Sequence, residues 1–320
     1  MNYLKGLVKR VNLNDFVSGS LIFLLICLLI NGYLGRRAEP TPRAHDGILD
    51  LRSWDLVKQL VKLDGEWEFY WQQLLTPADF APGNERANLS GMFVAPGSWK
   101  GYRWQDRKLT SEGFATFRLT LLLPETRQTL ALSLPQIYTA YRLWADGELL
   151  CSAGRVGRSR AMMTPQYLQR VVPFQPQSSR VELVIQVSNF YHRRGGLWRP
   201  LQLGSFERVK REFDFQNIFG LLVMSSFLLM ALYNLTLYKY LKSDPAPLYL
   251  GLFFLIGALR SVLVGRILIT QIYPNFPWEL AMKLEYFTFY FCGPAFFRVL
   301  RCLYPKDIPS LLIRLIDGAA

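Results

Sequence analysis

Two carboxylates, Glu66 and Glu68, stand within an aromatic run in the segment LDGEWEFYWQQLL, residues 63–75. If this segment is a strand, alternate residues project from one face, about 7 Å apart along the chain. Glycosidases use two carboxyl groups ~5 to 9.5 Å apart, so this pair could carry out acid–base chemistry on a glycosidic bond. Catalytic carboxylates flank a substrate from opposite sides, however, whereas neighbours on one strand approach from one side. The pattern therefore favours surface residues, solvated or in salt bridges.

The aromatic residues that alternate with this pair, Trp67, Phe69 and Trp71, fall together on the opposite face. Flat aromatic rings could stack on a sugar, but large aromatic residues on one face of a sandwich strand usually belong to the core. The sequence thus favours this segment as scaffold, with the three rings buried.

A better candidate for binding is NFYHRRGGLW, residues 189–198, which follows a predicted strand. Loops at the rim of a rigid sandwich are where binding residues collect. Arg193 and Arg194 offer forked donors for carboxylates or adjacent hydroxyls, Trp198 offers a flat stacking surface, and His192 directly precedes the two arginines. The alternative is a solvated basic turn with Trp198 folded into the core. A second candidate cluster, in GSWKGYRW, contains Trp99, Tyr102 and Trp104.

Motifs for metal and cofactor chemistry are missing from the sequence. The two histidines, His45 and His192, are far apart, and no cysteine or carboxylate spacing suggests a zinc site. The run Gly154 to Gly157 lacks the phosphate-loop pattern, and no GxSxG occurs. We therefore expect no metal site, no cofactor and no catalytic residue in these 320 residues.

The net charge of +13 could suggest a nucleic-acid partner. Residues 38–215, however, hold 23 Lys and Arg against 18 Asp and Glu, so more than half of the excess flanks the apolar runs at the two ends. Basic residues beside apolar helices are typical of membrane anchoring. No basic groove with interleaved aromatic residues is evident, so we do not expect nucleic-acid binding.

Four apolar segments predict membrane helices: residues 17–34, 218–238, 246–264 and 278–300, with the start of another near 308. The first follows basic residues as a signal peptide does, but it lacks small residues at a cleavage site, which favours a retained anchor. The sequence thus divides into a cytoplasmic N-terminus and anchor at 1–37, an outer domain at 38–215, and the first part of a membrane domain at 216–320.

Orientation follows from the charges of the loops. Lys239 and Lys242 follow one predicted helix, and Arg298, Arg301 and Lys306 follow another, whereas Arg266 is the only charged residue in the loop 265–277. The positive-inside rule places the two richer ends in the cytoplasm and residues 38–215 outside. We therefore expect a multi-pass protein of a bacterial inner membrane with a periplasmic domain.

Alternating hydrophobicity predicts strands in the outer domain at 66–71, 115–123, 129–134, 139–144 and 181–187, separated by turns such as Asp146-Gly147. Several short strands with little helix indicate an antiparallel sandwich or jelly roll. The predicted fold class is an all-β jelly-roll sandwich followed by an α-helical transmembrane bundle.

Five blocks carry a resemblance to a family: LDGEWEFYWQQLL, VAPGSWKG at 94–101, GFATFRLTLLLP at 113–124, YTAYRLWADGELLCSAGRVG at 138–157 and VSNFYHRRGGLWRPLQLG at 187–204. Followed by apolar helices, they resemble the bacterial seven-transmembrane receptors with diverse intracellular signalling modules. The resemblance implies a galactose-binding-like outer domain, also found in some glycoside hydrolases. It further implies a cytoplasmic kinase, cyclase, cyclic di-GMP synthase or phosphatase after the seventh helix. The sequence stops after three of these helices, which indicates a fragment.

Ionisable residues in the predicted membrane helices are candidates for coupling: Arg260, Lys283 and Glu285. The alternative is ordinary anchoring at the interface, because Glu279 and Lys283 form a helical i, i+4 pair beside Trp278, and Arg260 is near a helix end.

The sequence as a whole predicts a sensory receptor whose outer sandwich binds a small ligand, either a carbohydrate or a carboxylated metabolite, and signals through helices in the lipid bilayer. It leaves open a homodimer, a membrane-tethered carbohydrate-active enzyme or its accessory carbohydrate-binding module, and an assembly domain that binds a neighbouring membrane protein.

Overall fold

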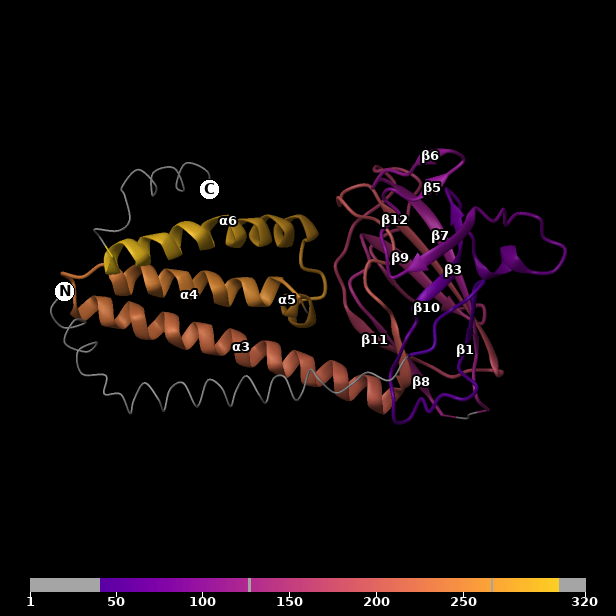
Figure 1. The fold of residues 1–320 in the computed structure, drawn as a ribbon, viewed down its shortest axis with the longest axis horizontal. Helices are drawn as coiled ribbons and strands as arrows, with labels where there is room; N and C mark the ends of the chain where they lie inside the picture. The colour runs from indigo at the N-terminus through magenta and orange to yellow at the C-terminus, as the bar shows by residue number, and fades with distance from the viewer. Residues whose placement is uncertain (1–40, 126–127, 266, 305–320) are drawn as a thin grey trace.

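The computed structural model describes residues 41–125, 128–265 and 267–304. Figure 1 shows a lobe of β-strands at one end and long helices that point away from it, side by side. The predicted apolar helix at 17–34 and the predicted start of a helix near 308 lie outside the described residues.

The β-lobe consists of two facing sheets. The larger has the order β10-β9-β12-β7-β3-β4, with the short β1 pairing in parallel with β7, and every other pair is antiparallel. Its strands are β1 (Ile48–Asp50), β3 (Gly65–Trp71), β4 (Gly91–Ala95), β7 (Gly113–Leu122), β9 (Ala140–Ala145), β10 (Glu148–Ala153) and β12 (Arg180–Asn189).

The smaller sheet has the order β11-β8-β13-β2. Its strands are β2 (Val61–Lys62), β8 (Leu130–Leu134), β11 (Arg170–Phe174) and β13 (Gln202–Ser205), and a separate hairpin joins β5 (Arg103–Trp104) to β6 (Arg107–Lys108). From β7 onward the chain crosses repeatedly between the two sheets, as it does in a jelly roll. The predicted all-β sandwich followed by helices is confirmed.

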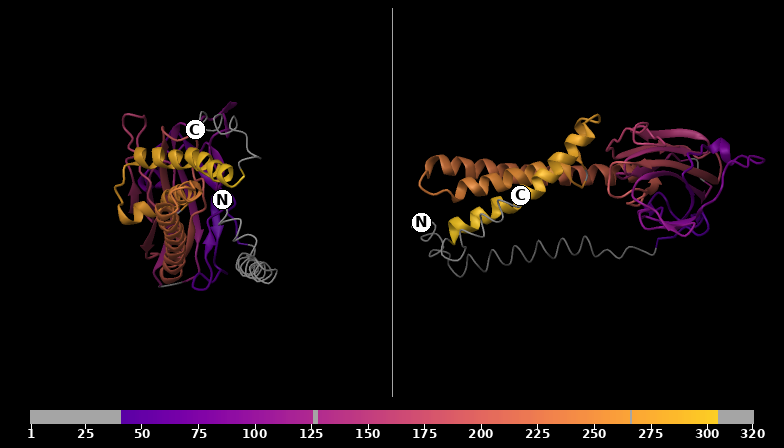
Figure 2. Two further views of the ribbon diagram at one scale, coloured as in Figure 1. Left: turned by 90° about the vertical axis from the view of Figure 1, so that its left-hand side faces the viewer. Right: turned by 90° about the horizontal axis from the view of Figure 1, so that it is seen from above.

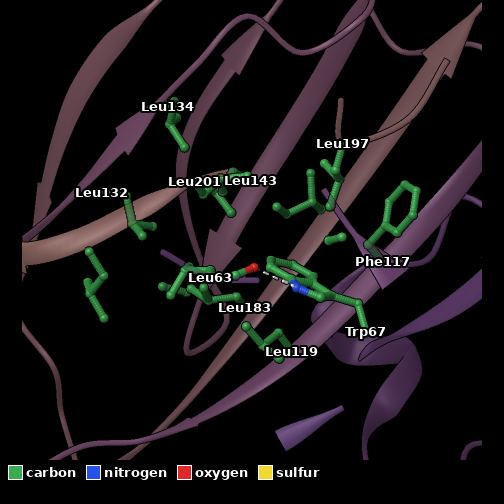
Figure 3. Close-up of a cluster of buried hydrophobic side chains, with 14 of the residues drawn as sticks. Leu63, Trp67, Phe117, Leu119, Leu132, Leu134, Leu143, Leu183, Leu197 and Leu201 are labelled. Carbon is green, nitrogen blue, oxygen red and sulfur yellow. Dashed lines mark hydrogen bonds between the residues drawn. The ribbon is translucent and has the colours of Figure 1, made fainter. Parts of the chain in front are cut away.

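The core fills the space between the sheets. Trp67 and Phe69 are completely buried, and Trp71 is only 6% exposed. Figure 3 shows Trp67 among leucines from several strands, with its indole Nε1 donating a hydrogen bond to the Leu63 carbonyl at 3.0 Å. Because this buried indole has a partner, the ring is stabilising without leaving a polar atom unsatisfied. The predicted core role of the three aromatic residues is confirmed.

The opposite face of β3 carries the two carboxylates. Glu68 Oε2 accepts a hydrogen bond from the Tyr70 hydroxyl at 2.6 Å and lies 3.1 Å from Arg118 Nη1. Arg118 also pairs with Glu182 on β12. Glu66 Oε2 accepts a hydrogen bond from the Asp46 backbone N–H at 3.2 Å. Both carboxylates thus hold neighbouring segments together, as the salt-bridged alternative predicted.

The helices are α3 (Phe206–Tyr240), α4 (Ala246–Leu263), α5 (Leu268–Ile272) and α6 (Trp278–Leu303). The α3 helix begins twelve residues before the predicted start at 218 and ten before the predicted domain boundary at 216. Its N-cap, Ser205, is the last residue of β13, and the Ser205 side chain accepts a hydrogen bond from the Arg208 backbone N–H. Residues 207–214 are mostly charged, so a search for apolar runs does not detect this part of the helix.

Two of the described helices, α3 and α4, are long and apolar enough to cross a membrane. The α6 helix forms at the predicted position, but it does not meet the same test, since it carries Glu279, Lys283 and Glu285 near its start and Arg298 and Arg301 near its end. Large apolar side chains, including those of Phe219, Leu222 and Leu229, are exposed along α3. Such a surface is expected where a helix faces lipid.

Replacing Phe69 by alanine should lower the free energy of unfolding of the sandwich by about 3 to 5 kcal/mol, because a buried aromatic ring is lost and a cavity remains. Phe69 packs against Phe93 and Phe117, with ring centroids 5.5 Å and 5.2 Å away. Urea unfolding of the full chain in detergent, followed by the fluorescence of the buried tryptophans, measures the change.

The matched control is Val94→Ala on the neighbouring strand β4, whose side chain is exposed. Its unfolding free energy should stay within about 0.5 kcal/mol of the wild type. Equal destabilisation by the two substitutions would show that Phe69 does not stabilise the sandwich through burial.

Candidate functional site

The candidate site lies at the end of the sandwich that faces the helices. It is built from the loop 190–199 after β12, from Tyr138 just before β9, and from the connection 154–169 between β10 and β11. The His192 ring stacks on the Tyr138 ring, with centroids 4.1 Å apart and planes inclined by 10°. Sequence reasoning did not identify Tyr138, because a lone tyrosine ahead of a strand has no distinctive spacing.

The Asn189 side chain fixes the start of this loop. Its Nδ2 donates hydrogen bonds to the Ser111 carbonyl at 2.8 Å and to the His192 carbonyl at 2.7 Å. Its Oδ1 accepts hydrogen bonds from the His192 backbone N–H at 3.0 Å and from the Thr139 hydroxyl at 3.2 Å. Since Asn189 is itself completely buried, these bonds hold both rings of the stack in place.

The predicted residues of the loop lie together. The Arg194 guanidinium lies 3.7 Å from the centroid of the Trp198 ring, within the range of a cation–π interaction. The Trp198 ring in turn meets Tyr138 edge to face at 6.5 Å. Arg193 is exposed next to them. The sequence-based grouping of His192, Arg193, Arg194 and Trp198 therefore corresponds to one cluster in space, while their role as ligand-binding residues stays a prediction.

Positive charge dominates the surroundings of Tyr138. Burial raises the pKa of the Tyr138 hydroxyl, whereas the charges of Arg199, Arg194 and Arg193 act to lower the pKa and that of Glu285 acts to raise it. The charges of three arginines and one glutamate thus act on the hydroxyl of Tyr138. Forked cationic donors beside flat rings can hold an anionic group and stack on a ring attached to it.

The second predicted cluster has a different role. Trp99 is completely buried, and its indole Nε1 donates a hydrogen bond to the Ser111 carbonyl at 3.1 Å. Tyr102 and Trp104 are half-buried and pack against the core, and the Tyr102 hydroxyl donates to the Met92 carbonyl at 2.7 Å. The rim position predicted for Trp99 is not found, because the ring forms part of the core, while a ligand-binding role for Tyr102 and Trp104 stays a prediction.

Trp99 nevertheless supports the first cluster. A Cβ atom on Gly195 would lie 2.3 Å from the Trp99 ring, so only glycine allows the loop to rest on the indole. The backbone of the loop is fixed there as well, since Gly97 and Trp99 donate N–H bonds to the carbonyls of Leu197 and Gly195. The paired glycines in the sequence are the signal of this close approach.

The connection between β10 and β11 joins the site to the helices. The Tyr167 ring meets Tyr138 edge to face at 5.6 Å and Trp278, the first residue of α6, at 5.8 Å. The Tyr191 ring also meets Trp278, at 5.6 Å. A continuous series of ring contacts therefore runs from His192 through Tyr138 and Tyr167 to Trp278. None of these contacts was predicted, because they join segments far apart in sequence.

Three side-chain amides add hydrogen bonds to the same contact. Gln166 donates to the Pro274 carbonyl at 3.1 Å, and Gln169 donates to the Gly265 carbonyl at 2.9 Å. In the other direction, Gln271 on α5 donates to the Gln169 carbonyl at 2.9 Å. The sandwich is thus bonded to both ends of the segment that connects α4 to α6.

The ionisable residues predicted for coupling separate into two groups. Arg260 Nη1 lies 3.4 Å from the Glu285 carbonyl and 3.4 Å from the Thr288 hydroxyl, so it joins α4 to α6. Glu285 is half-buried near the loop arginines. Lys283 instead forms an exposed pair with Glu279 at 2.7 Å, the geometry of surface anchoring. Arg260 and Glu285 therefore remain the better candidates for coupling. Within the described ranges, no cluster of three or more His, Cys, Asp or Glu could hold a metal ion.

Comparison with known proteins identifies the helical part. Residues 216–316 match the family described as 7TM diverse intracellular signalling. The helical part of the chain is similar to this family over those residues. The 7TM diverse intracellular signalling match begins within α3 and covers α4, α5 and α6, and the chain is accordingly a membrane protein with two candidate spans among its described helices. No curated protein matches the chain.

Several solved structures resemble part of the chain. They include a GH2 β-galacturonidase from Eisenbergiella tayi bound to galacturonate, with 14% sequence identity, a TM-score of 0.33, and coverage of 46% of this chain and 24% of that chain. A β-glucuronidase from Ruminococcus gnavus has 13% identity and a TM-score of 0.34, with coverage of 46% and 28%. The chain thus spans about a quarter of the length of those enzymes.

Protonation of His192 should make the folded chain less stable at acidic pH. Burial lowers the pKa of His192 below its ordinary value of 6.5. The hydrogen bond with the Arg194 carbonyl acts to raise this pKa, whereas the charges of Arg193 and Arg194 act to lower it. As the pH falls below about 6.5, the unfolded chain binds a proton that the folded chain does not, so stability is lost. The stability contribution of the neutral ring is fully present above pH 6.5.

His192→Phe keeps a ring to stack on Tyr138 but cannot bind a proton. Urea unfolding between pH 5 and pH 7 should therefore show a smaller loss of stability at acidic pH in this variant than in the wild type. Arg194→Gln should retain most of the pH dependence, because burial is the largest cause of the lowered pKa. An identical pH dependence in His192→Phe and the wild type would contradict this account.

Proposed function

We propose that the chain is the sensory part of a membrane receptor, in which the sandwich binds a small anionic ligand at the His192–Trp198 cluster and transmits its occupancy to the membrane helices. The family of the helical part supports a sensory role. The sandwich would lie in the periplasm of a bacterium, with the helices in the inner membrane and the output module on the cytoplasmic side.

One observation carries this proposal: the series of ring contacts from His192 to Trp278. Stacked and edge-to-face rings have preferred geometries, so a shift of one ring is resisted by the next. A ligand that drew Arg194 away from Trp198 would disturb the Tyr138 ring, which meets both Trp198 and Tyr167. Tyr167 contacts Trp278, and its hydroxyl lies 2.9 Å from Met282 Sδ on α6. The side chain of Tyr167 therefore contacts both the candidate site and α6.

The chemistry of the cluster favours a ligand with a carboxylate and a flat or ring-shaped body. Arginine binds carboxylates through two parallel N–H donors, and Trp198 with Tyr138 provides aromatic surfaces for stacking. A sugar acid combines both features, and so does a carboxylated metabolite with a ring. A neutral sugar would leave the arginines without an anionic partner, so we expect weaker binding.

Signalling requires that the ligand bind one arrangement of sandwich and helices more tightly than the other, since equal affinity would shift no equilibrium. The contact between the sandwich and α6 is suited to such a shift, because its apolar cluster is small, with Tyr167, Ile267 and Ala281 as its buried members, and the rest consists of single hydrogen bonds and ring edges. An apolar core as large as that of the sandwich would be much more costly to rearrange.

A thermal-unfolding screen of the full chain in detergent tests the ligand class. Glucuronate and galacturonate should raise the melting temperature more than glucose or galactose do, with about 2.7 kcal/mol of stabilisation at a hundredfold excess over Kd. The double variant Arg194→Gln, Trp198→Ala should lose the shift.

The control is Arg103→Gln, Trp104→Ala, which removes the same residue types from β5 and should keep the shift. Flat melting curves for every compound would contradict small-ligand binding and favour an assembly domain with a protein partner. Turnover of aryl glycosides would favour the enzyme alternative.

A second experiment tests transmission. Once a stabilising acid is found, a fluorophore on Cys302, with the other three cysteines replaced, should change its emission when that acid binds. Trp278→Ala should keep the melting shift but reduce the emission change severalfold, because the ring contact between Tyr167 and α6 is lost. Tyr273→Ala, an exposed residue outside the ring series, should preserve both signals. Loss of the emission change in both variants would contradict a specific role for Trp278.

A further inference from the structure

Two arginines beside the candidate site form no ion pair in the part of the chain that the structure describes, although the charge of Arg193 acts on Glu285 at longer range. Arg193 and Arg199 are exposed, and neither forms an ion pair there. Arg194 differs from them because its guanidinium is stacked on Trp198. Both arginines belong to the loop 190–199, in which Tyr191 contacts Trp278 on α6, so this loop lies on the side of the sandwich that faces the helices.

The contact between α4 and α6 places this loop relative to a membrane. Arg260, near the end of the candidate span α4, is level with Glu285 and Thr288 on α6. The outer edge of the hydrocarbon layer is therefore expected close to Glu285. Trp278 lies seven residues earlier on α6, or ~10 Å farther out at 1.5 Å per residue. The headgroup layer on each side of a bilayer is ~5 to 7 Å thick, so Trp278 is expected just outside the headgroups.

The sandwich reaches this level directly, because Tyr191, two residues before Arg193, contacts the Trp278 ring. A long arginine side chain in this loop can thus extend toward the phosphates of the headgroup layer. Exposed side chains nearby have the composition of a membrane interface: Tyr191 is 42% exposed, Tyr273 is 56% exposed and Ile272 is 76% exposed. Tyrosine and tryptophan are enriched at this depth.

We propose that Arg193 and Arg199 bind the phosphate groups of anionic phospholipids in the leaflet that faces the sandwich. Arginine is the side chain best suited to phosphate, and the low content of acidic residues in the loop removes competition for its donors. This lipid contact is separate from ligand binding at Arg194 and Trp198. Through these two arginines the lipid composition of the membrane influences the ring series, since their charges act on Tyr138.

The test uses the full chain in nanodiscs of phosphatidylcholine with about one-third phosphatidylglycerol, which gives the bilayer a negative surface potential. After transfer to detergent, native mass spectrometry measures how much phosphatidylglycerol remains bound. Arg193→Gln, Arg199→Gln should reduce this retention roughly tenfold, because two charges near an anionic surface are lost. Raising the salt to 1 M before transfer should reduce the wild-type retention as well, since the Debye length falls to about 3 Å.

The matched control, Arg103→Gln, Arg107→Gln, removes two exposed arginines from the β5–β6 hairpin, which lies away from the helices (Figure 1). It should retain phosphatidylglycerol as the wild type does. Arg193→Lys, Arg199→Lys keeps the charge and should retain most of the lipid, which guards against a fold defect in the glutamine variant.

Three results would overturn the proposal. Unchanged retention in Arg193→Gln, Arg199→Gln would show that the lipid binds elsewhere, and an equal loss in the β5–β6 control would show a general effect of charge. Displacement of the bound lipid by soluble glycerol 3-phosphate would assign the two arginines to a free anion. The melting shift with sugar acids tests the ligand site separately, so failure of one proposal leaves the other testable.

Discussion

The absence of a linker between β13 and α3 is the constraint on which the remaining architecture depends. Ser205 ends the last strand and caps the first helix, so the direction of α3 is fixed by the edge of the smaller sheet. Val209 and Phe213 on the first turns of α3 are buried, which extends the sandwich core onto the helix. The sandwich therefore cannot turn freely on the membrane domain, and any motion between them must bend α3 or shift the strand that leads into it.

A second contact, at α5 and the start of α6, completes the attachment. The two contacts differ in kind: Figure 2 shows α3 continuing directly into the sandwich, whereas α6 begins near it as a separate element. The α3 contact is covalent and apolar. The other contact combines a small apolar cluster around Tyr167, Ile267 and Ala281 with amide-to-carbonyl bonds and ring edges. A body held firmly at one point and weakly at another has one preferred motion, which is rotation about the firm point with separation at the weak one.

The sequence predicted the main strands of the sandwich well, because they are short apolar runs bounded by turn residues, and the outer part of β3 alternates between its two faces. Trp67, Phe69 and Trp71 followed that pattern into the core. Short strands such as β2 and β13 escaped prediction because two to four residues carry too little periodicity. The start of α3 was missed since its first two turns are charged, and their burial depends on the neighbouring sheet. Within the candidate site, the run from His192 to Trp198 was visible as a motif. Tyr138, Tyr167 and Trp278 were not, because their grouping arises from tertiary packing.

The buried position of Trp99 shows how the candidate site depends on the scaffold. An indole in a segment rich in glycine and basic residues resembles a ligand platform from sequence alone, yet its burial lets Gly195 rest on the ring and directs the neighbouring arginines outward. A side chain larger than hydrogen at Gly195 would push this loop away from the core. The positions of the exposed guanidinium groups thus depend on a buried ring, so a substitution at Trp99 would displace the arginine loop without changing the arginines themselves.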